Sequence, residues 1–537
     1  MCMTLIAGKA ASKTGRVLVG HNEDDYVHAS VRHYLVPAMD WPSGTVLPAE
    51  PDNVCIPQVP HTASYWWMQV RGPEGGLSTA DSFFNEHGVC VVSDSSCGSH
   101  EDACAGEPAK GGIVYELRRA VAERAASARD GLKIAIELIR DYGYASPGRM
   151  YTIADKQEAF MLQVVRGHRY LAARVPDDAL VILPNHYTFH TLTDAEEMFY
   201  PDDLVSHAAE MNWFDPEKEP FDFAAAYQDP KTYLHPENTL RQKYATALLT
   251  GKESEGYPFC VKAVRKVGAE DIMRALSTHY EGSPDDPRTG LGASPHYTGV
   301  RRVCTGTTVE SAVYEMDETA EGTTVWTSFG RPCTLPYLPL HPLCGVPEEL
   351  EKPLDPIQEA QTHLIPIPGA TAHRDDLWQR FQDFENGFDL RYSDLLPRVQ
   401  YMKNRLQGDL ARENARLKGA DRETLHAFDK SAVIRASEAL PEVLNAEILS
   451  AVFTCDHTVR VEFVCPCAPD IRRLYFGPGR LEPQRDFVRA SGLKRTEKGW
   501  QADFRFETRP LTAVGPGEYE FFLTGAGFAA QTIMELQ

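Results

Sequence analysis

The chain has little of what marks membrane, secreted and nucleic-acid-binding proteins. No stretch approaches the roughly 20 consecutive apolar residues of a membrane-spanning helix, and the start lacks the basic and apolar segments of a signal peptide. Lys and Arg number 54 against 76 Asp and Glu, which gives a formal net charge of −22. Such a charge repels nucleic acid and anionic membranes. These absences predict a cytoplasmic protein with no nucleic-acid partner and no membrane partner.

Cysteine is present, but in no pattern that favours a metal site or a disulfide framework. The 12 cysteines form no paired CxxC motifs, and Cys465 and Cys467 are the one tight pair. His186 and His190 are close in sequence, but no carboxylate completes a ligand set at the usual spacing. We therefore expect reduced thiols, no metal and no cofactor.

One cysteine is distinguished by its position. Cys2 follows Met1, and methionine aminopeptidases remove Met1 when the next side chain is small. The mature chain would then begin with a residue that carries both a thiol and an α-amino group, whose ordinary pKa values are about 8.5 and about 7.7–8.0. Near neutral pH this amine can accept the thiol proton, which is how an N-terminal nucleophile is activated.

The residues after Cys2 predict a hairpin that brings polar groups to the thiol. Residues 3–7 and 16–20 have the character of strands, and the polar residues 12–15 between them favour a turn. With the turn centred on Lys13 and Thr14, cross-strand partners sum to about 27. Cys2 then lies opposite the segment 21–25, which reads His-Asn-Glu-Asp-Asp. The sequence thus predicts a site built around its own N-terminus.

A family resemblance rests on this opening and on further segments that agree in order. Met1-Cys2, the hairpin and Gly20-His21-Asn22-Glu23-Asp24 resemble the opening of the C69 dipeptidases, which are N-terminal nucleophile (Ntn) hydrolases related to choloylglycine hydrolases and secernins. The later segments that agree are Asn85-Glu86-His87-Gly88, Pro184-Asn185-His186, His279-Tyr280-Glu281-Gly282-Ser283-Pro284 and Trp326 through Pro339. The resemblance extends to about residue 340.

The order of strands and helices predicts an α+β fold. Apolar residues at helical spacing indicate helices over residues 113–128 and up to about residue 143, and four short strands between residues 150 and 183 favour an antiparallel meander. The resemblance implies an αββα sandwich of two antiparallel sheets flanked by helices. We predict a catalytic domain over 1–372, a helical segment over 373–446 and a small all-β module over 447–537.

The resemblance also implies a catalytic role for each of several residues. Cys2 is expected to be the nucleophile, with its own α-amino group as the base. Asp24 is expected to hold this amino group, and Asn185 to donate to the oxyanion. His21 stands where relatives commonly have arginine, and a basic residue there would lower the pKa of the thiol.

Three further residues are expected near the nucleophile. Arg301 is expected to support the thiol, although the adjacent Arg302 leaves the register open. Asn22 and Asn85 are expected at the substrate pocket, and Asn85 also fits a plain turn.

Hydrolysis of dipeptides through a thioester on Cys2 is the expected activity, so the expected partner is a small peptide substrate. Two alternatives remain. One is an amidase that acts on another acyl amide, such as a bile-salt conjugate or a penicillin-like compound, and the other is a secernin-like protein whose scaffold serves interaction. The sequence leaves open a homo-oligomer, the removal of Met1 and the preferred substrate side chain.

Overall fold

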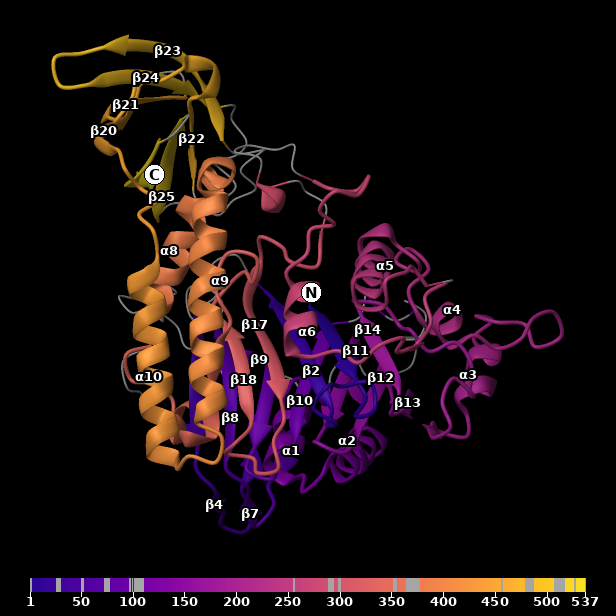
Figure 1. Ribbon diagram of the computed structural model, residues 1–537. Helices are drawn as coiled ribbons and strands as arrows, with labels where there is room; N and C mark the ends of the chain where they lie inside the picture. The colour runs from indigo at the N-terminus through magenta and orange to yellow at the C-terminus, as the bar shows by residue number, and fades with distance from the viewer. Residues whose placement is uncertain are drawn as a thin grey trace. The chain divides into compact units, whose positions relative to one another are not determined.

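The computed structural model describes residues 2–25, 30–49, 53–71, 78–95, 98, 100, 111–254, 256–287, 294–297, 301–350, 355–363, 377–454, 457–478, 487–506, 517–525 and 528–536. Its contacts divide the chain into two units, with the first formed by Met1–Thr278, Arg302–Trp378 and Gln407–Arg435, and the second by His279–Arg301, Gln379–Leu406 and Ala436–Gln537. Figure 1 labels the strands and helices of the chain. Among the described helices, none combines the length and the apolar character needed to cross a membrane. The boundaries expected at residues 372 and 446 stay predictions.

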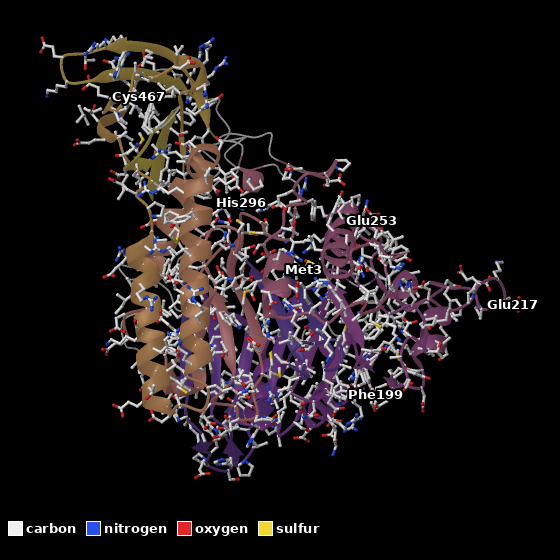
Figure 2. The ribbon with its side chains drawn as sticks, in the orientation of Figure 1. Met3, Phe199, Glu217, Glu253, His296 and Cys467 are labelled. Atoms are coloured by element: carbon white, nitrogen blue, oxygen red, sulfur yellow. The ribbon has the colours of Figure 1, made fainter. Side chains whose placement is uncertain are left out.

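The first sheet, in unit 1, carries the N-terminal strand near its centre. All its strand pairs are antiparallel. The strand order is β16 (Val261–Lys262), β14 (Ala179–Leu183), β1 (Met3–Ala7), β2 (Leu18–Asp24), β17 (Thr308–Glu315), β18 (Thr324–Ser328) and β19 (Leu338–Leu340). Cys2 immediately precedes Met3, the first residue of β1 (Figure 2), and so lies at the end of a buried central strand.

The second sheet, also in unit 1, contains most of the predicted meander. Its order is β15 (Met198–Phe199), β13 (Tyr170–Arg174), β12 (Ala159–Gly167), β11 (Tyr144–Ala154), β10 (Cys90–Ser95), β9 (Ser78–Asn85), β8 (Tyr65–Arg71) and β3 (Ser30–Val36). The fourth strand of the meander was assigned to the wrong sheet, because β14 pairs with β1 and not with β13. All five residues of β14 are buried, which suits a strand covered on both faces.

The two sheets face each other, and helices cover their outer sides. Strands β1 and β10 are in contact across the layers, and Tyr314 of β17 packs against the rings of Trp66 and Phe84 from the second sheet. Helices α1 (Glu116–Arg124) and α2 (Ala128–Tyr142) pack on the second sheet, while α5 (Pro236–Thr250) and α6 (Ala269–Leu276) pack on the first. The layers are therefore αββα, and the predicted fold class is confirmed.

Smaller elements complete unit 1. They are the ladders β4 (Met39–Asp40) with β7 (His61–Thr62) and β5 (Val46–Leu47) with β6 (Ile56–Pro57), and the short helices α3 (Leu204–Glu210), α4 (Phe223–Tyr227) and α7 (Pro356–Gln361). Helix α6 approaches β2 so closely that a Cβ atom at Gly20 would lie 2.3 Å from Ile272 Cγ2. Glycine at this position therefore lets α6 cover the strand that carries the polar cluster.

The register of the N-terminal hairpin differs from the predicted one. Met3 lies opposite Asn22 and Thr4 opposite His21, so partner numbers sum to 25 and not to 27. The connection is a longer loop over residues 8–17, within which Ser12 forms a bridge with Val267. A shift of two residues keeps every side chain on its predicted face. Extending this register places Cys2 opposite Glu23, within the predicted cluster.

Unit 2 contains the predicted C-terminal β module. The order of its sheet is β20 (Glu447–Phe453), β21 (Thr458–Val464), β24 (Trp500–Arg505), β23 (Val488–Arg495), β22 (Tyr475–Pro478), β25 (Gly517–Gly525) and β26 (Phe528–Leu536). Aromatic side chains such as Phe476, Phe504 and Phe521 stack in its core. The predicted helical segment contains α8 (Leu377–Leu390), α9 (Tyr392–Arg416) and α10 (Arg422–Ala439).

Candidate active site

The structure brings Cys2 together with the polar cluster at the end of β2. Cys2 is 1% exposed, and its thiol donates to Glu23 Oε1 at 3.6 Å and, more weakly, to the Asp24 backbone oxygen at 4.0 Å. The Cys2 Sγ, a ring nitrogen of His21 and a carboxylate oxygen of Glu23 all lie within 4.8 Å of one another. A thiol, an imidazole and a carboxylate therefore share one buried space.

His21 is held by a short chain of hydrogen bonds. The Thr4 hydroxyl donates to Asp94 Oδ2 at 2.6 Å, so its oxygen is an acceptor toward His21 Nδ1 at 2.9 Å. This arrangement places a hydrogen on Nδ1 of His21. The other ring nitrogen, Nε2, lies 3.4 Å from Glu23 Oε2, which also accepts. Both ring nitrogens thus face acceptors, an environment that favours the imidazolium.

The surroundings raise the pKa of both the Cys2 thiol and the His21 imidazole. Burial and then the charge of Glu23 raise the pKa of the Cys2 thiol well above its usual range, while the positive N-terminus lowers it. For His21, burial lowers the pKa, but Glu23, Asp94 and Asp24 outweigh burial and raise it. The site therefore favours a protonated thiol beside a protonated imidazole, and the thiolate depends on nearby positive charge.

Asp24, expected to hold the α-amino group, is buried at the end of β2. Its Oδ1 accepts a hydrogen bond of 2.6 Å from the Thr308 hydroxyl on β17. The register between these two strands shifts between Thr308 and Glu310, and such irregularities re-aim side chains next to functional sites. Asp24 is thus fixed one residue beyond Glu23.

Asn185 is fixed by an arginine that the sequence analysis did not identify. Arg241 on α5 donates from Nη2 to Asn185 Oδ1 at 2.7 Å and from Nη1 to the Cys2 backbone oxygen at 2.9 Å. A guanidinium is only a donor, so the oxygen of the Asn185 amide must face Arg241. The amide nitrogen of Asn185 therefore faces away from Arg241.

The sequence did contain a signal for Arg241. Its helix has polar residues at inward positions, with Asn238, Arg241 and Gln242 all buried at a spacing of three or four residues. Arg241 also donates to Asn238 Oδ1 and to the Glu237 backbone oxygen. Polar residues along the buried face of a helix indicate that these side chains hold neighbouring groups in place, as Arg241 holds Asn185 and the Cys2 carbonyl.

The two asparagines expected at the substrate pocket have structural partners. Asn22 donates to the backbone oxygens of Leu276 and Val303, both at 2.9 Å, and accepts from the Ser311 hydroxyl. The amide of Asn22 thus joins β2 to the end of α6 and to β17. Its predicted contact with substrate stays a prediction.

Asn85 is occupied in the same way. It donates to the backbone oxygens of Ala122 and Ala125 and accepts from the backbone nitrogens of His87 and Val89. These bonds fix the turn after β9 and the end of α1. Asn85 therefore has a structural role at this turn, and its predicted contact with substrate stays a prediction.

The expected arginine pair divides between the two units. Arg301 is partly buried and belongs to unit 2, whereas Arg302 is buried in unit 1. Which of the two supports the nucleophile stays a prediction.

Two other buried arginines form a basic pair in unit 1. Arg118 on α1 and Arg149 on β11 both donate to the Ser93 hydroxyl, at 2.8 and 3.0 Å, and both lie over the ring of Tyr115. Burial and the charge of Arg149 lower the pKa of Arg118 to about 10. For Arg149, burial lowers the pKa, but interactions with Tyr115, Tyr144 and Tyr151, and then with Cys2, raise it well above its usual range. Of this pair, Arg149 therefore lies within electrostatic reach of Cys2.

His186 and His190 point to different partners. His186 Nε2 pairs with Gln242 Oε1 at 2.8 Å, and burial lowers the pKa of this histidine to about 4. His190 Nδ1 instead pairs with Asp222 Oδ2 at 2.8 Å. The two rings therefore do not converge on one ligand.

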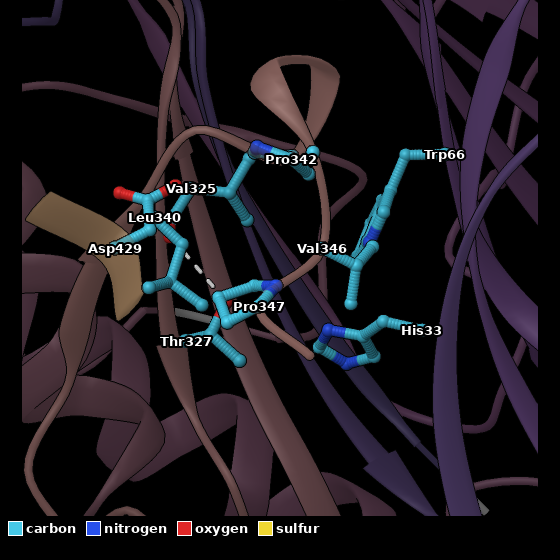
Figure 3. Close-up of a pocket in the computed structure, with 10 residues that line it drawn as sticks. His33, Trp66, Val325, Thr327, Leu340, Pro342, Val346, Pro347 and Asp429 are labelled. Atoms are coloured by element: carbon cyan, nitrogen blue, oxygen red, sulfur yellow. Dashed lines mark hydrogen bonds between the residues drawn. The ribbon is translucent and has the colours of Figure 1, made fainter. Parts of the chain in front are cut away.

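A pocket in unit 1 has a lining distinct from the residues around Cys2 (Figure 3). Its walls include His33 and Trp66 from the second sheet and Leu340 from the first. His33 forms a buried pair with Glu310 at 2.7 Å, and most other lining groups are apolar. This pocket lies between the facing sheets and shares no lining residue with the cluster at Cys2.

Comparison with known proteins places this fold and site in a family. Residues 1–355 match the family model described as peptidase family C69. A probable dipeptidase of Latilactobacillus sakei is 25% identical over 353 residues, which cover 63% of this chain and 73% of that protein. A probable dipeptidase of Salmonella dublin is 27% identical over 357 residues, which cover 63% of this chain and 80% of that protein.

Solved structures with a detectable likeness include two forms of a conjugated bile acid hydrolase from Clostridium perfringens. The C2A mutant has a TM-score of 0.31 at 12% identity and covers 61% of this chain and 89% of its own. The R18L variant has a TM-score of 0.30 at 13% identity, with the same coverage.

The fold is an α+β sandwich with a buried cysteine at the start of the central strand β1. The family model covers well over half of the chain, so the chain belongs to peptidase family C69, and it is a hydrolase of the peptidase class.

Proposed function

We propose that this protein is a cysteine-type dipeptidase that uses Cys2 as its nucleophile after removal of Met1. The observation that carries the proposal is the placement of Cys2. Its buried thiol lies beside Glu23 and His21, while its backbone oxygen shares Arg241 with the side chain of Asn185. The names of the relatives support the dipeptide as substrate.

In the proposed reaction the α-amino group of Cys2 accepts the thiol proton. The thiolate attacks the peptide carbonyl carbon, and the proton then passes to the departing amine as the C–N bond breaks. This leaves a thioester on Cys2. Water, deprotonated by the same amine, hydrolyses the thioester and regenerates the thiol. Asp24 is proposed to hold the amine in the position from which it transfers the proton.

Asn185 and His21 are proposed to stabilise the charges that develop. The fixed amide nitrogen of Asn185 donates to the oxyanion, and one such donor contributes about 2.7–4 kcal/mol in a well-formed oxyanion hole. The His21 imidazolium, favoured by its carboxylate neighbours, stabilises the thiolate. It thereby offsets part of the rise in thiol pKa that burial and Glu23 cause.

The substrate's charged ends require partners of opposite sign. Arg118 and Arg149 are proposed to attract the carboxylate of the dipeptide, since both guanidiniums are buried and both donate to Ser93 on β10, a strand in contact with β1. Glu23 and Asp94, two buried carboxylates of the cluster around Cys2 and His21, are proposed to attract the substrate's ammonium group. A buried ion pair of this kind discriminates strongly against substrates that lack one charge.

The test is hydrolysis of a panel of unmodified dipeptides, with the start of the chain confirmed by mass spectrometry. The Cys2→Ala variant should lose turnover, while Cys90→Ala, which removes another buried thiol of unit 1, should keep it. N-acetylated dipeptides should be poor substrates. Turnover that survives Cys2→Ala would refute the proposed nucleophile. Turnover confined to other acyl amides, or none from protein that begins at Cys2, would refute the dipeptidase proposal in favour of an amidase or an interaction protein.

A further inference from the structure

Unit 2 contains two buried histidines whose rings face each other. Nε2 of His279 lies 3.1 Å from Nε2 of His296, and the two rings meet nearly edge to face. His279 is 1% exposed, and the side chain of His296, labelled in Figure 2, is fully buried. Two ring nitrogens at this separation must have something positive between them or must share a proton.

In each ring the outer nitrogen, Nδ1, faces a carboxylate, while the inner nitrogen, Nε2, faces the other ring. His279 Nδ1 lies 3.0 Å from Glu281 Oε1, and His296 Nδ1 lies 2.7 Å from Asp389 Oδ1. The Ser294 hydroxyl also donates to Asp389 Oδ1, at 3.1 Å, as expected for an ionised carboxylate. Because carboxylates accept, both Nδ1 atoms carry hydrogen.

The inner nitrogens therefore bear lone pairs when the rings are neutral. Two lone pairs aimed at each other across 3.1 Å repel, so neutral rings alone do not account for the arrangement. A single shared proton would leave the two lone pairs competing for it. A divalent cation would satisfy both lone pairs at once, beside the buried carboxylate of Asp389.

We propose that His279 and His296 bind a divalent transition metal ion of the zinc class. Zinc–nitrogen distances of about 2.0–2.1 Å and a tetrahedral angle place two histidine nitrogens roughly 3.3 Å apart, close to the 3.1 Å found here. A ligating histidine almost always donates its other N–H to a carboxylate or carbonyl, which is the role that Glu281 and Asp389 fill. The proposal departs from the expectation, based on sequence spacing, that the chain binds no metal.

The ion would join segments that are distant in sequence. His279 and His296 are 17 residues apart in the sequence, and Asp389 lies far from both in the sequence, on α8 within the same unit. A tetrahedral ion needs two further ligands, which water could supply. The site would then stabilise unit 2, whatever reaction occurs at Cys2.

The experiment measures zinc on the full-length chain, first by elemental analysis and then by titration of chelator-treated protein against a competing dye. Wild type should bind a single equivalent, and His279→Ala and His296→Ala should each lose at least about 100-fold in affinity. His341→Ala is the matched control, because His341 also pairs with a buried carboxylate, Asp429, at 2.9 Å. This variant should bind zinc as wild type does.

A second measurement keeps the proposal testable if the histidine variants fail to fold. Asp389→Asn removes only the outer-shell charge and should weaken zinc binding by about 10–100-fold. Cobalt substitution of the wild type should give the visible absorption of a tetrahedral ion, and an added sulfur-to-metal charge-transfer band would identify a cysteine ligand. Wild-type protein that binds neither zinc nor cobalt, or His279 and His296 variants that bind zinc unchanged, would overturn the proposal and leave a shared proton between the rings. These readouts do not depend on peptidase activity.

Discussion

The charge on His21 should control the reactivity of the Cys2 thiol, and His21→Asn and His21→Arg separate charge from shape. Neighbouring carboxylates raise the pKa of His21, so its imidazolium should persist above the ordinary pKa of about 6.5. As the pH rises through the raised pKa, the positive charge is lost and the thiolate loses its support. Asparagine removes the charge at every pH, whereas arginine keeps it throughout.

The size of the effect follows from the distance. A His21 ring nitrogen lies within 4.8 Å of Cys2 Sγ, and opposite unit charges at that distance attract by about 0.9 kcal/mol at the permittivity of water and about 3.5 kcal/mol at an effective value of 20. Since one pKa unit corresponds to about 1.4 kcal/mol, His21→Asn should raise the pKa of the thiol by about 0.6–2.5 units. His21→Arg should instead flatten the alkaline decline of activity.

The assay is alkylation of Cys2 by iodoacetamide across pH, followed by mass spectrometry of the N-terminal peptide, because this reports thiolate without requiring a substrate. The pH dependence of kcat/KM on a dipeptide is measured beside it. Equal alkylation midpoints for wild type and His21→Asn would refute the electrostatic role of His21. If His21→Arg has the same pH profile as wild type, deprotonation of His21 is not the cause of the decline in kcat/KM at high pH.

Three further substitutions test the framework around the site. Arg241→Lys keeps the charge but loses the two guanidinium nitrogens that donate to Asn185 and to the Cys2 carbonyl. The value of kcat/KM should therefore fall by about 100-fold, and near-normal steady-state kinetics would contradict this. Asn22→Ala removes the amide that donates to two backbone carbonyls, which should lower the free energy of unfolding in denaturant by about 3 kcal/mol; a loss below the error of that measurement would argue against its structural role. Gly20→Ala forces a Cβ against Ile272 and should lower stability by about 1–3 kcal/mol, and thermal unfolding at the wild-type temperature would show that α6 moves freely.

Local periodicity predicted the elements well, but not which sheet each strand joins. The meander between residues 150 and 183 was expected as one unit because its strands follow one another closely, yet β14 crosses to the sheet of β1. A buried five-residue apolar strand fits either sheet equally well. Only the pairing with Met3–Ala7, more than 170 residues away in the chain, decides between them.

The sequence also did not predict the register of the N-terminal hairpin or the structural role of Asn22. The hairpin register was missed by two residues because the polar residues 12–15 suggested a tight turn, whereas a bridge from Ser12 to Val267 holds a longer loop. Asn22 has the same polar character in the sequence whether it binds substrate or backbone. Its structural role depends on the backbone oxygens of Leu276 and Val303, which are more than 250 residues away in the sequence and lie beside Asn22 only in the folded chain.

The charges around Cys2 also bear on when the proposed nucleophile becomes active. Glu23, Asp94 and Asp24 all raise the pKa of its thiol, and the positive N-terminus opposes them. Removal of Met1 would move that positive charge onto Cys2 itself, where the opposing attraction is stronger because the distance is shorter. On the proposed mechanism the same step also creates the base that accepts the thiol proton. A carboxylate-rich pocket would therefore keep the thiol protonated in the Met1-bearing chain and let excision of one residue supply both the base and the compensating charge.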